Sequence, residues 1–564
     1  MADNPPVPSA SLRLTEGGLS SAWRSFVPDD VVEQLRRHPG ATPLADGDHA
    51  DAVVLFIDVA SFTPMSEALT SSGAYGTEEL TRLLNGWFDT MVGLVSRHGG
   101  TVAEFAGDAL TAVFRSDHRN RPATERRAVR CALSMQAEMA RFRTVVTRAG
   151  SFELAMKAGL AAGPLLSTIM GDPDLRLASV LAGPALDRAA RAERHALPGE
   201  VVVDHQLVRG GLDAEVRERR GRWSVVGGVR GEVPPAPAVL HDALDEATAR
   251  RLAPFLHPAI AERLRSGRHD FVNEHRKVTV AFVGAPELTI DDPRSVAELQ
   301  RFVAAAVRVI DRYGGHLRQV ATGDKGALLV VCFGAPVSHE DDEERAVRCC
   351  LELLQLPGWS LRAGVTTGSV YCGEVGSNSR REYSVIGDSV NLASRLLQAA
   401  RPGQLLIDRP THERVREATV HDTLAPIRVK GKRGPVDVWA VHAVRDPRGA
   451  PPGPATAAPL LGRDGELARI HALAERARAG EGQVVRLTGE AGIGKSRLAA
   501  DVVRMAEELG FASSAGVCRS HGTTTSYLVW RSIWSDLLEL DTSRPIAEQA
   551  EQLTRRIEIG RAHV

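Results

Sequence analysis

The order of apolar and polar residues predicts that the first domain of this chain begins with a buried strand. Residues 53–57 are all apolar and lead directly into Asp58. A short, continuous apolar run of this kind is typical of a strand that is buried on both faces. Because burying an unpaired charge is costly, we expect Asp58 at the end of the strand, facing a positive group. Ser61 or Thr63 can then cap a helix that begins immediately afterwards.

A second carboxylate follows in a pattern that predicts a hairpin. An amphipathic helix is expected over residues 80–95, and residues 98–114 predict strand, turn and strand with Gly107 and Asp108 in the turn. Taken singly, a strand-end aspartate and a Gly-Asp turn are ordinary structural features. Two aspartates at the ends of adjacent strands, beside a helix N-terminus, would instead form an oxygen-rich site for magnesium ions and a phosphate.

Most of this pattern occurs a second time farther along the chain. The matching segments are 53–63 with 278–285, 98–100 with 313–315, 106–108 with 322–324, 181–187 with 385–391, and two expected short helices at 25–36 and 254–265. We therefore predict a first domain at 48–205 and a second at 274–443, each an α+β sandwich of the ferredoxin-like kind. The segment 1–47 would hold one short helix, and 206–273 would be a linker with a helical part.

A different pattern begins after a Pro- and Ala-rich linker at residues 444–460. An apolar strand is expected at 484–488, then a glycine-rich loop, then an amphipathic helix over 497–509. The loop reads Gly-x4-Gly-Lys-Ser, which is a P-loop. The residues that would bind the phosphates and magnesium of ATP are Gly489, Gly492, Gly494, Lys495 and Ser496.

The pattern that should complete this third domain is not found. No apolar strand ending in paired acidic residues follows the P-loop, so we assign 461–557 to a truncated ATPase domain. Residues 558–564 resemble a translated sequencing adapter, and we expect them to be an artefact.

Composition and charge exclude several classes of function. The formal net charge of the 564 residues is −1 at pH 7, so we expect no nucleic-acid partner. None of the six cysteines lies in a Cys-x-x-Cys pair, which favours reduced thiols over a disulfide framework. No apolar run approaches the length of a membrane span, and the N-terminus lacks the features of a signal peptide. These features together favour a cytoplasmic protein.

The two aspartate motifs carry a family resemblance. Phe-Ile-Asp-Val-Ala-Ser-Phe-Thr at 56–63 and Phe-Ala-Gly-Asp-Ala at 105–109 resemble the metal-binding signature of class III nucleotide cyclases. The resemblance implies that Asp58 and Asp108 bind two Mg²⁺ or Mn²⁺ ions and that Phe62 and Thr63 contact the substrate phosphates. The active site of this family lies between two domains, so the two domains of this chain are expected to pair with each other.

The second half carries the complementary part of the signature. Residues 385–395 resemble the catalytic helix of the family, which implies that Asn391 orients the ribose and Arg395 stabilises the transition state. The two residues are four apart and share one helix face, which by itself is also typical of a solvated surface. A Lys-Gly-Lys match implies that Lys430 binds phosphate.

The resemblance to adenylyl cyclases implies that Gln319 and Ser384 recognise the base, at the positions where that family has a lysine and an aspartate or threonine. The position of Gln319 is uncertain by one residue in register. Glutamine and serine can both donate and accept hydrogen bonds, so the pair can satisfy adenine but can also turn to suit guanine. Glu104 of the first half would suit guanine, but it is expected beside the other site and away from the substrate.

The second half lacks one of the two metal-site aspartates, and the first half lacks the asparagine of the catalytic helix. Gly284 stands where the second half would need a counterpart of Asp58, and Asp187 stands where the first half would need the asparagine, although Arg191 persists. One complete and one defective site are therefore expected. This arrangement, with an AAA-type ATPase behind it, resembles the soluble, bicarbonate-responsive adenylyl cyclases and their bacterial relatives. The resemblance implies a small-molecule or bicarbonate regulator at the defective site.

These features predict an enzyme of intracellular signalling that converts ATP into cyclic AMP and pyrophosphate by a two-metal mechanism at one composite site. Two alternatives stay open. The chain could be a P-loop signalling ATPase whose cyclase domains are an inactive nucleotide-sensing platform. It could also be a cyclase with a relaxed preference between ATP and GTP.

Overall fold

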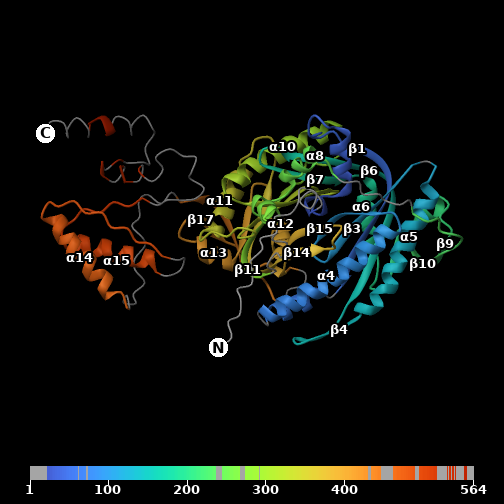
Figure 1. Cartoon of the computed structure of the whole chain (residues 1–564), viewed down its shortest axis with the longest axis horizontal. Helices are drawn as coiled ribbons and strands as arrows, with labels where there is room; N and C mark the ends of the chain where they lie inside the picture. The colour runs from blue at the N-terminus through green and yellow to red at the C-terminus, as the bar shows by residue number, and fades with distance from the viewer. Residues whose placement is uncertain are drawn as a thin grey trace, which may run out of the picture. The chain divides into compact units, whose positions relative to one another are not determined.

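The computed structural model describes residues 22–60, 62–71, 74–117, 119–236, 244–266, 274–290, 293–429, 434–445, 462–489 and 494–516, with short stretches between 530 and 555. The chain divides into two compact units, Met1–Ala443 and Val444–Val564 (Figure 1). The first unit contains two large sheets and the helices that pack on them. The second contains two long helices.

The first sheet of unit one has the strand order β2-β3-β1-β6-β8-β10-β9, with β7 paired to β6. Its strands are β1 (Asp48–Ala60), β2 (Thr101–Ala106), β3 (Ala109–Ser116), β6 (Ala155–Asp172), β7 (Arg176–Ala182), β8 (Val201–Asp204), β9 (Ala214–Arg220) and β10 (Trp223–Val229). Its helices are α3 (Phe62–Ser71), α4 (Ala74–Arg97), α5 (Arg121–Glu138), α6 (Pro184–Arg194) and α7 (His205–Arg209). A separate ribbon joins β4 (Thr144–Thr147) to β5 (Gly150–Glu153).

Strand β1 is buried on both faces, as the apolar run predicts. Val53, Leu55 and Ile57 point to the core that includes residues of α4 and α5. The alternate residues Ala52 and Val54 pack with residues of α6 on the opposite face. This double burial explains why the strand shows a continuous apolar run rather than an alternation.

The second sheet repeats the first, with the order β12-β13-β11-β14-β16-β18-β17 and β15 paired to β14. Its strands are β11 (Glu274–Ala285), β12 (His316–Gly323), β13 (Gly326–Phe333), β14 (Arg362–Gly376), β15 (Arg381–Ile386), β16 (Leu405–Asp408), β17 (Thr419–Thr423) and β18 (Val438–Val444). Its helices are α10 (Pro293–Arg312), α11 (Asp342–Leu354), α12 (Asp388–Ala399) and α13 (Arg409–Val415). The shorter helices α2 (Asp29–Arg37), α8 (Glu246–Arg250) and α9 (Pro258–Arg265) lie outside the two sheets. The predicted duplication of an α+β domain is confirmed.

The first sheet extends beyond residue 205, where the sequence pattern predicts a linker. Strand β10 pairs with β8, and β9 pairs with β10 at the edge of the sheet. Trp223 and Val225 of β10 are buried, whereas β9 carries mostly charged residues that face solvent. An edge strand with so few apolar positions gives no alternation for sequence reasoning to find.

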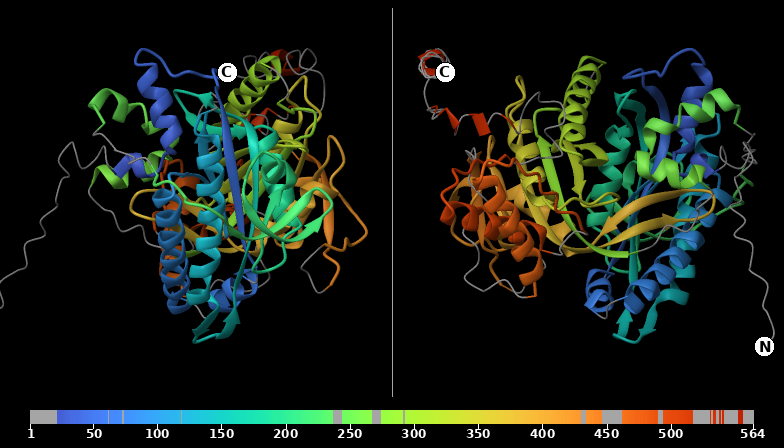
Figure 2. Two further views of the ribbon diagram at one scale, coloured as in Figure 1. Left: turned by 90° about the vertical axis from the view of Figure 1, so that its right-hand side faces the viewer. Right: turned by 60° about the vertical axis from the view of Figure 1, so that its left-hand side comes forward.

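The two halves of unit one lie side by side and share contacts (Figures 1 and 2). The carboxamide of Gln300 on α10 donates to the backbone oxygen of Gly171 at 2.8 Å and accepts from its N–H at 2.9 Å. Tyr371 and Val375 of β14 are buried in the core of the first half. Long strands of each half therefore reach across and anchor the pairing of the domains.

The second unit contains α14 (Asp464–Arg478) and α15 (Lys495–Glu508). The predicted helix after the P-loop is present as α15, but the predicted strand at 484–488 is wrong, because these residues form no strand. Val484 is 98% exposed, and no strand exists among the described residues of this unit to pair with it. An isolated strand leaves its backbone groups without partners and is not stable by itself.

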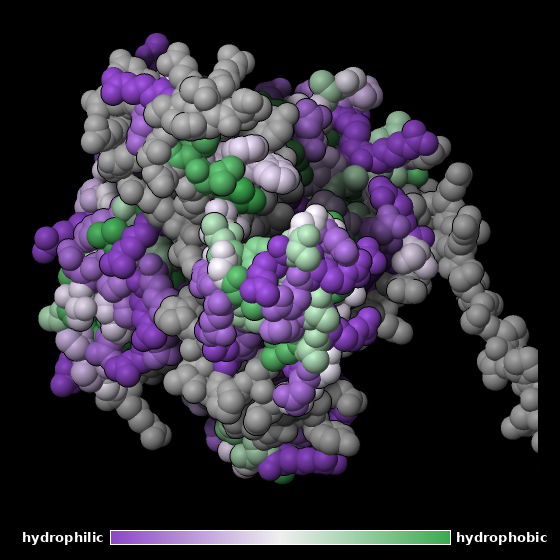
Figure 3. Space-filling model, turned by 90° about the vertical axis from the view of Figure 1, so that its left-hand side faces the viewer, coloured by the Kyte–Doolittle hydropathy of each residue, from purple (hydrophilic) through white to green (hydrophobic). Residues whose placement is uncertain are grey.

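On the face drawn in Figure 3, most of the coloured side chains are polar, with apolar side chains among them. Within the described part of the chain, no helix combines the length and the apolar character that crossing a bilayer requires.

Candidate active site

Two cavities open between the halves of unit one. The smaller cavity has a volume of about 270 Å³, and its lining includes Phe62 and Asp108 from the first half and Gln319 and Asn391 from the second. The larger cavity has a volume of about 640 Å³. Gln319 lines both cavities, so the two spaces share a wall.

The predicted metal-binding carboxylates are electrostatically coupled. Asp108 lies in the turn between β2 and β3, and Asp58 lies near the end of β1. Burial and the negative charge of Asp58 raise the pKa of Asp108 to about 7. Asp58 is 3.7 Å from Nζ of Lys157, which also pairs with Glu193. The expected positive group facing Asp58 is therefore a lysine on the neighbouring strand β6.

This arrangement suits a divalent cation. Two carboxylates that repel each other gain when a hard cation binds between them, and oxygen ligands are those that Mg²⁺ and Mn²⁺ prefer. The described residues hold no cluster of three or more metal-ligating side chains. Asp58 and Asp108 would therefore supply only part of a coordination shell, and substrate oxygens and water would supply the rest.

Strand register shows which residues of the two halves are equivalent. Asp58 pairs with Lys157 on one side and Ala109 on the other. Gly284 occupies the same position in the second sheet, opposite Arg362 and Leu328. Since glycine has no side chain to ligate a metal, the second half cannot form the same carboxylate pair.

The helices that follow β7 and β15 are equivalent in the same way. Gly159 lies against the backbone of α6 and Gly364 against that of α12, and in each case an added Cβ would come within 2.6 Å of a helix backbone atom. These close approaches align α6 with α12. In this alignment Asp187 is equivalent to Asn391, and Arg191 is equivalent to Arg395.

The two helices present their polar residues differently. On α12, Asn391 is exposed and lines the smaller cavity, and Arg395 lies one turn later, forming no ion pair with any described residue. On α6, Arg191 donates to Asp324 at 2.9 Å. Burial and the charge of Asp324 raise the pKa of Asp187. The charge of the first-half arginine is thus balanced by a carboxylate of the second half, in a pair that is exposed to solvent.

Asp324 does not occupy the position of Asp108. The hairpin of β12 and β13 is four residues longer than that of β2 and β3 when Phe333 is aligned with Phe114, since these two rings lie against the equivalent residues Gly315 and Gly100. Asp324 therefore lies farther along its hairpin, at the edge of the larger cavity. The sequence match between the two Gly-Asp turns does not correspond to a structural equivalence.

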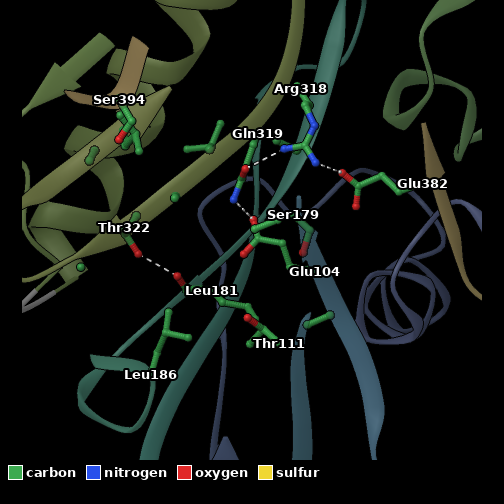
Figure 4. A pocket seen from close by; sticks show the side chains of 18 of the residues that line it. Glu104, Thr111, Ser179, Leu181, Leu186, Arg318, Gln319, Thr322, Glu382 and Ser394 are labelled. Atoms are coloured by element: carbon green, nitrogen blue, oxygen red, sulfur yellow. Dashed lines mark hydrogen bonds and ion pairs between the residues drawn. The ribbon is translucent and has the colours of Figure 1, made fainter. Parts of the chain in front are cut away.

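The proposed base-recognition residues belong to a hydrogen-bonded network, of which Figure 4 shows Gln319, Arg318, Glu104 and Glu382. Arg318 Nη1 donates to Oε1 of Gln319 at 2.9 Å, and Nε2 of Gln319 donates to the carboxylate of Glu104 from the first half. Ser384 is fully buried, and its hydroxyl accepts from Arg318 at 3.0 Å. Glu382 lies 3.6 Å from the same guanidinium group.

The larger cavity, lined by Gly284, Asp187 and Arg191 of the site that is expected to be defective, is rich in basic residues. Those in its lining are Arg176, Arg191, Arg194, Arg318, Lys325, Arg362 and Arg380. Burial lowers the pKa of Arg176 to about 10. Acidic residues are fewer, so the space carries an excess of positive charge.

Several predicted residues fall partly or wholly outside the described structure. Lys430 and Gly492 lie outside the described residues, as does the predicted adapter at 558–564. Thr63 and Ser496 are the second residues of α3 and α15, but their side chains are not described. In the P-loop, Lys495 Nζ donates to the backbone oxygen of Gly489 at 3.0 Å, and Gly494 has a φ of 95°.

Sequence reasoning missed Lys157 and Arg318 and the contact of Glu104 with Gln319. Lys157 is identified only through the pairing of β1 with β6, which joins residues that are 99 positions apart in the register Asp58–Lys157. Glu104 is recognised only when both halves are placed together. No local pattern contains either piece of information.

The fold and the site define a pair of class III nucleotidyl cyclase domains followed by an AAA domain. The adenylate and guanylate cyclase catalytic domain family matches residues 45–233 and 299–443, which together are more than half of the chain, and this chain belongs to that family. The AAA ATPase domain family matches residues 459–563.

Two of the similar curated proteins are named adenylate cyclase type 10. The chain is 25% identical over 413 residues to human adenylate cyclase type 10, a match that covers 65% of this chain and 25% of the human protein. It is 24% identical over 570 residues to the rabbit protein of the same name, covering 90% of this chain and 34% of that protein. The chain thus spans only a quarter to a third of these relatives.

Among solved structures, a class III adenylyl cyclase-like ATP-binding protein from Pseudomonas aeruginosa resembles this chain at 11% identity. The match covers 68% of this chain and 92% of that one, with a TM-score of 0.43.

Proposed function

We propose that this chain is an adenylate cyclase that converts ATP into cyclic AMP and pyrophosphate at the smaller cavity. The observation that carries the proposal is the lining of this cavity, where Asp108 from one half meets Asn391 from the other. In the defective site, by contrast, Gly284 replaces the metal-site aspartate and Arg191 is bound to Asp324. Only the smaller cavity keeps both parts of the chemistry.

The reaction is an in-line displacement. The ribose 3′-oxygen attacks the α-phosphorus, the bond from that phosphorus to the bridging oxygen breaks, and pyrophosphate leaves while the 3′-hydroxyl proton is lost. Asp58 and Asp108 would hold two Mg²⁺ or Mn²⁺ ions, which supply charge neutralisation and acidify the hydroxyl. Asn391 orients the ribose, and Arg395 stabilises the charge that develops on the phosphates.

The remaining contacts to substrate come from three places. The N-terminus of α3, at Phe62 and Thr63, offers backbone N–H groups to the phosphates. Lys430 adds a positive charge to the same groups. Gln319 recognises the base edge, and Ser384 acts on the base through Arg318, to which its hydroxyl is bonded.

Two regulatory roles accompany this activity. The larger cavity, with its excess of arginine, takes a small anionic regulator such as bicarbonate. The P-loop at 489–496 binds ATP with magnesium through Lys495 and Ser496.

The test is a cyclic-nucleotide assay on the purified chain and on residues 1–445, with ATP or GTP and either Mg²⁺ or Mn²⁺. Metal-dependent formation of cyclic AMP that is lost in Asp108→Ala supports the proposal. A folded protein that binds ATP but forms no cyclic nucleotide would instead support the nucleotide-sensing platform.

A further inference from the structure

The side chain of Gln319 is held at both ends of its amide. Its oxygen accepts from Arg318 at 2.9 Å, and its nitrogen donates to Glu104. Turning the amide by half a turn would place its NH₂ group against the guanidinium and its oxygen against the carboxylate. Both contacts would then join like partners, donor to donor and acceptor to acceptor.

The partners of Gln319 are themselves fixed. The guanidinium of Arg318 also donates to the backbone oxygen of Phe105 at 3.1 Å and to Ser384 at 3.0 Å, and its side chain is only 6% exposed. Glu104 and Gln319 occupy equivalent positions of the two halves, because each follows a bulge and pairs with the corresponding residue of β3 or β13. The contact thus joins the two domains at a matched position.

From this geometry we propose that Glu104 and Arg318 lock the amide of Gln319 in one orientation and thereby set the base selectivity of the smaller cavity. The proposal rests on the proposed function, in which Gln319 faces the base. A free glutamine can turn to match adenine or guanine, whereas a locked one presents its remaining N–H and its remaining lone pair in fixed positions. A base with the wrong edge then leaves buried groups unpaired, which is what creates strong discrimination.

Glu104 acts here as a positioning residue and does not touch the substrate. It belongs to the first half, and it lines the larger cavity rather than the smaller one. A carboxylate at the edge of the defective site would therefore govern which nucleotide the complete site accepts.

The protonation state of Glu104 gives the proposal a second observable. Burial and the charge of Glu382 raise the pKa of Glu104 to about 7, against the opposing effects of Arg318, Gln319 and Arg380. A protonated Glu104 can donate to the amide oxygen as well as accept from the nitrogen, so the lock weakens as the pH falls below about 7. The triphosphate is common to ATP and GTP, so its own titration cancels in the ratio.

The experiment compares wild type with Glu104→Gln, which keeps the size of the side chain but can pair with either end of the amide. The matched control is Glu374→Gln, since Glu374 is also a partly buried carboxylate, is held by Arg381 at 3.1 Å, and has no recorded contact with Gln319. Two ratios are measured for each protein. One is kcat/KM for ATP over GTP, and the other is the Kd ratio of 3′-deoxy-ATP and 3′-deoxy-GTP, which lack the attacking hydroxyl.

We expect Glu104→Gln to bring both ratios about tenfold closer to unity, while Glu374→Gln leaves them unchanged. In wild type the ratios should also narrow as the pH is lowered from about 8 to about 6, and in Glu104→Gln they should be flat. The pH series on wild type tests the lock even if the variant fails to fold.

The outcomes separate this inference from the proposed function. A wild-type protein that forms no cyclic nucleotide contradicts the proposed function, and the Kd ratio still tests the lock. A cyclase whose ratios are near unity, or unchanged by Glu104→Gln and by pH, overturns the lock and leaves the proposed function standing.

Discussion

Replacing Asp108 by asparagine should stabilise the metal-free protein while it abolishes cyclase activity. The carboxylate of Asp108 is placed where its charge is unfavourable, because it is partly buried and faces the negative charge of Asp58. Asparagine has nearly the same shape and no charge. The change therefore removes the repulsion and also removes a ligand for the metal.

The size of the effect follows from the pKa. A rise from the ordinary value of 3.8 to about 7 corresponds to about 3 pKa units, or about 4 kcal/mol at most, and about 2 kcal/mol is a reasonable expectation for a partly exposed group. Because the pKa is higher in the folded state, the native protein holds more protons than the unfolded chain between about pH 4 and about pH 7. This contribution to stability is complete below about pH 4 and is lost as the pH rises through about 7.

The assay is urea unfolding followed by tryptophan fluorescence, in EDTA, at about pH 5 and about pH 8. Asp108→Asn should raise the urea concentration at the unfolding midpoint at about pH 8, and should raise it less at about pH 5. Addition of Mn²⁺ should stabilise wild type and not the variant, because only wild type has both carboxylates. Asp324→Asn is the control, since Asp324 is ion-paired with Arg191 and should gain nothing from neutralisation.

One result would refute the reasoning. If Asp108→Asn is no more stable than wild type at about pH 8 without metal, the Asp58–Asp108 pair is not under electrostatic strain. The case for a cation at this position would then have to stand on the sequence resemblance alone.

Three further outcomes are expected. Asp58→Ala and Asp108→Ala should each reduce kcat by at least several hundredfold, since each removes a preorganised electrostatic group. Asp324→Ala should keep most of the activity, and equal losses in all three would contradict a single site. A chain that ends at residue 445 should remain active, and its inactivity in a folded state would make the ATPase region part of the catalytic unit. Gln319→Lys should sharpen the preference for ATP, because lysine only donates hydrogen bonds, and an unchanged kcat/KM ratio would remove Gln319 from base recognition.

The parts of the site that the sequence predicts are those whose information is local. The apolar run before Asp58 and the hairpin around Asp108 are each contained within a few residues, and both form as expected. The partner of Asp58 is not local, because Lys157 is placed beside it by the pairing of β1 with β6, and several helices and strands separate the two in sequence. Which charge faces a carboxylate is therefore decided by register, and register depends on the whole sheet.

The two expectations that differ from the structure, the strand at 484–488 and the position of Glu104, also depend on contacts between distant parts of the chain. Residues 484–488 have the composition of a strand, yet strand formation needs neighbours that supply hydrogen bonds, and the described part of the second unit has none. The sequence analysis assigns Glu104 to the defective site and gives it no part in base recognition. In the structure, its carboxylate accepts a hydrogen bond from Gln319 of the other half. Composition predicts what a segment can form, and only the assembled chain shows what it contacts.

The two sites differ in whether their charged side chains have partners of opposite charge within the protein. In the defective site, Arg191 of the first half is bound by Asp324 of the second, so another residue of the chain balances its positive charge. At the other site, Asp108 lines the smaller cavity and is raised in energy by the charge of Asp58. Arg395 lies one turn beyond Asn391 and has no ion pair to a described residue. A metal–nucleotide complex would bring cations to Asp58 and Asp108 and phosphates to Arg395. Binding it would relieve the repulsion between Asp58 and Asp108 and give Arg395 anionic partners, and this supports placing the chemistry in the smaller cavity rather than in the larger one.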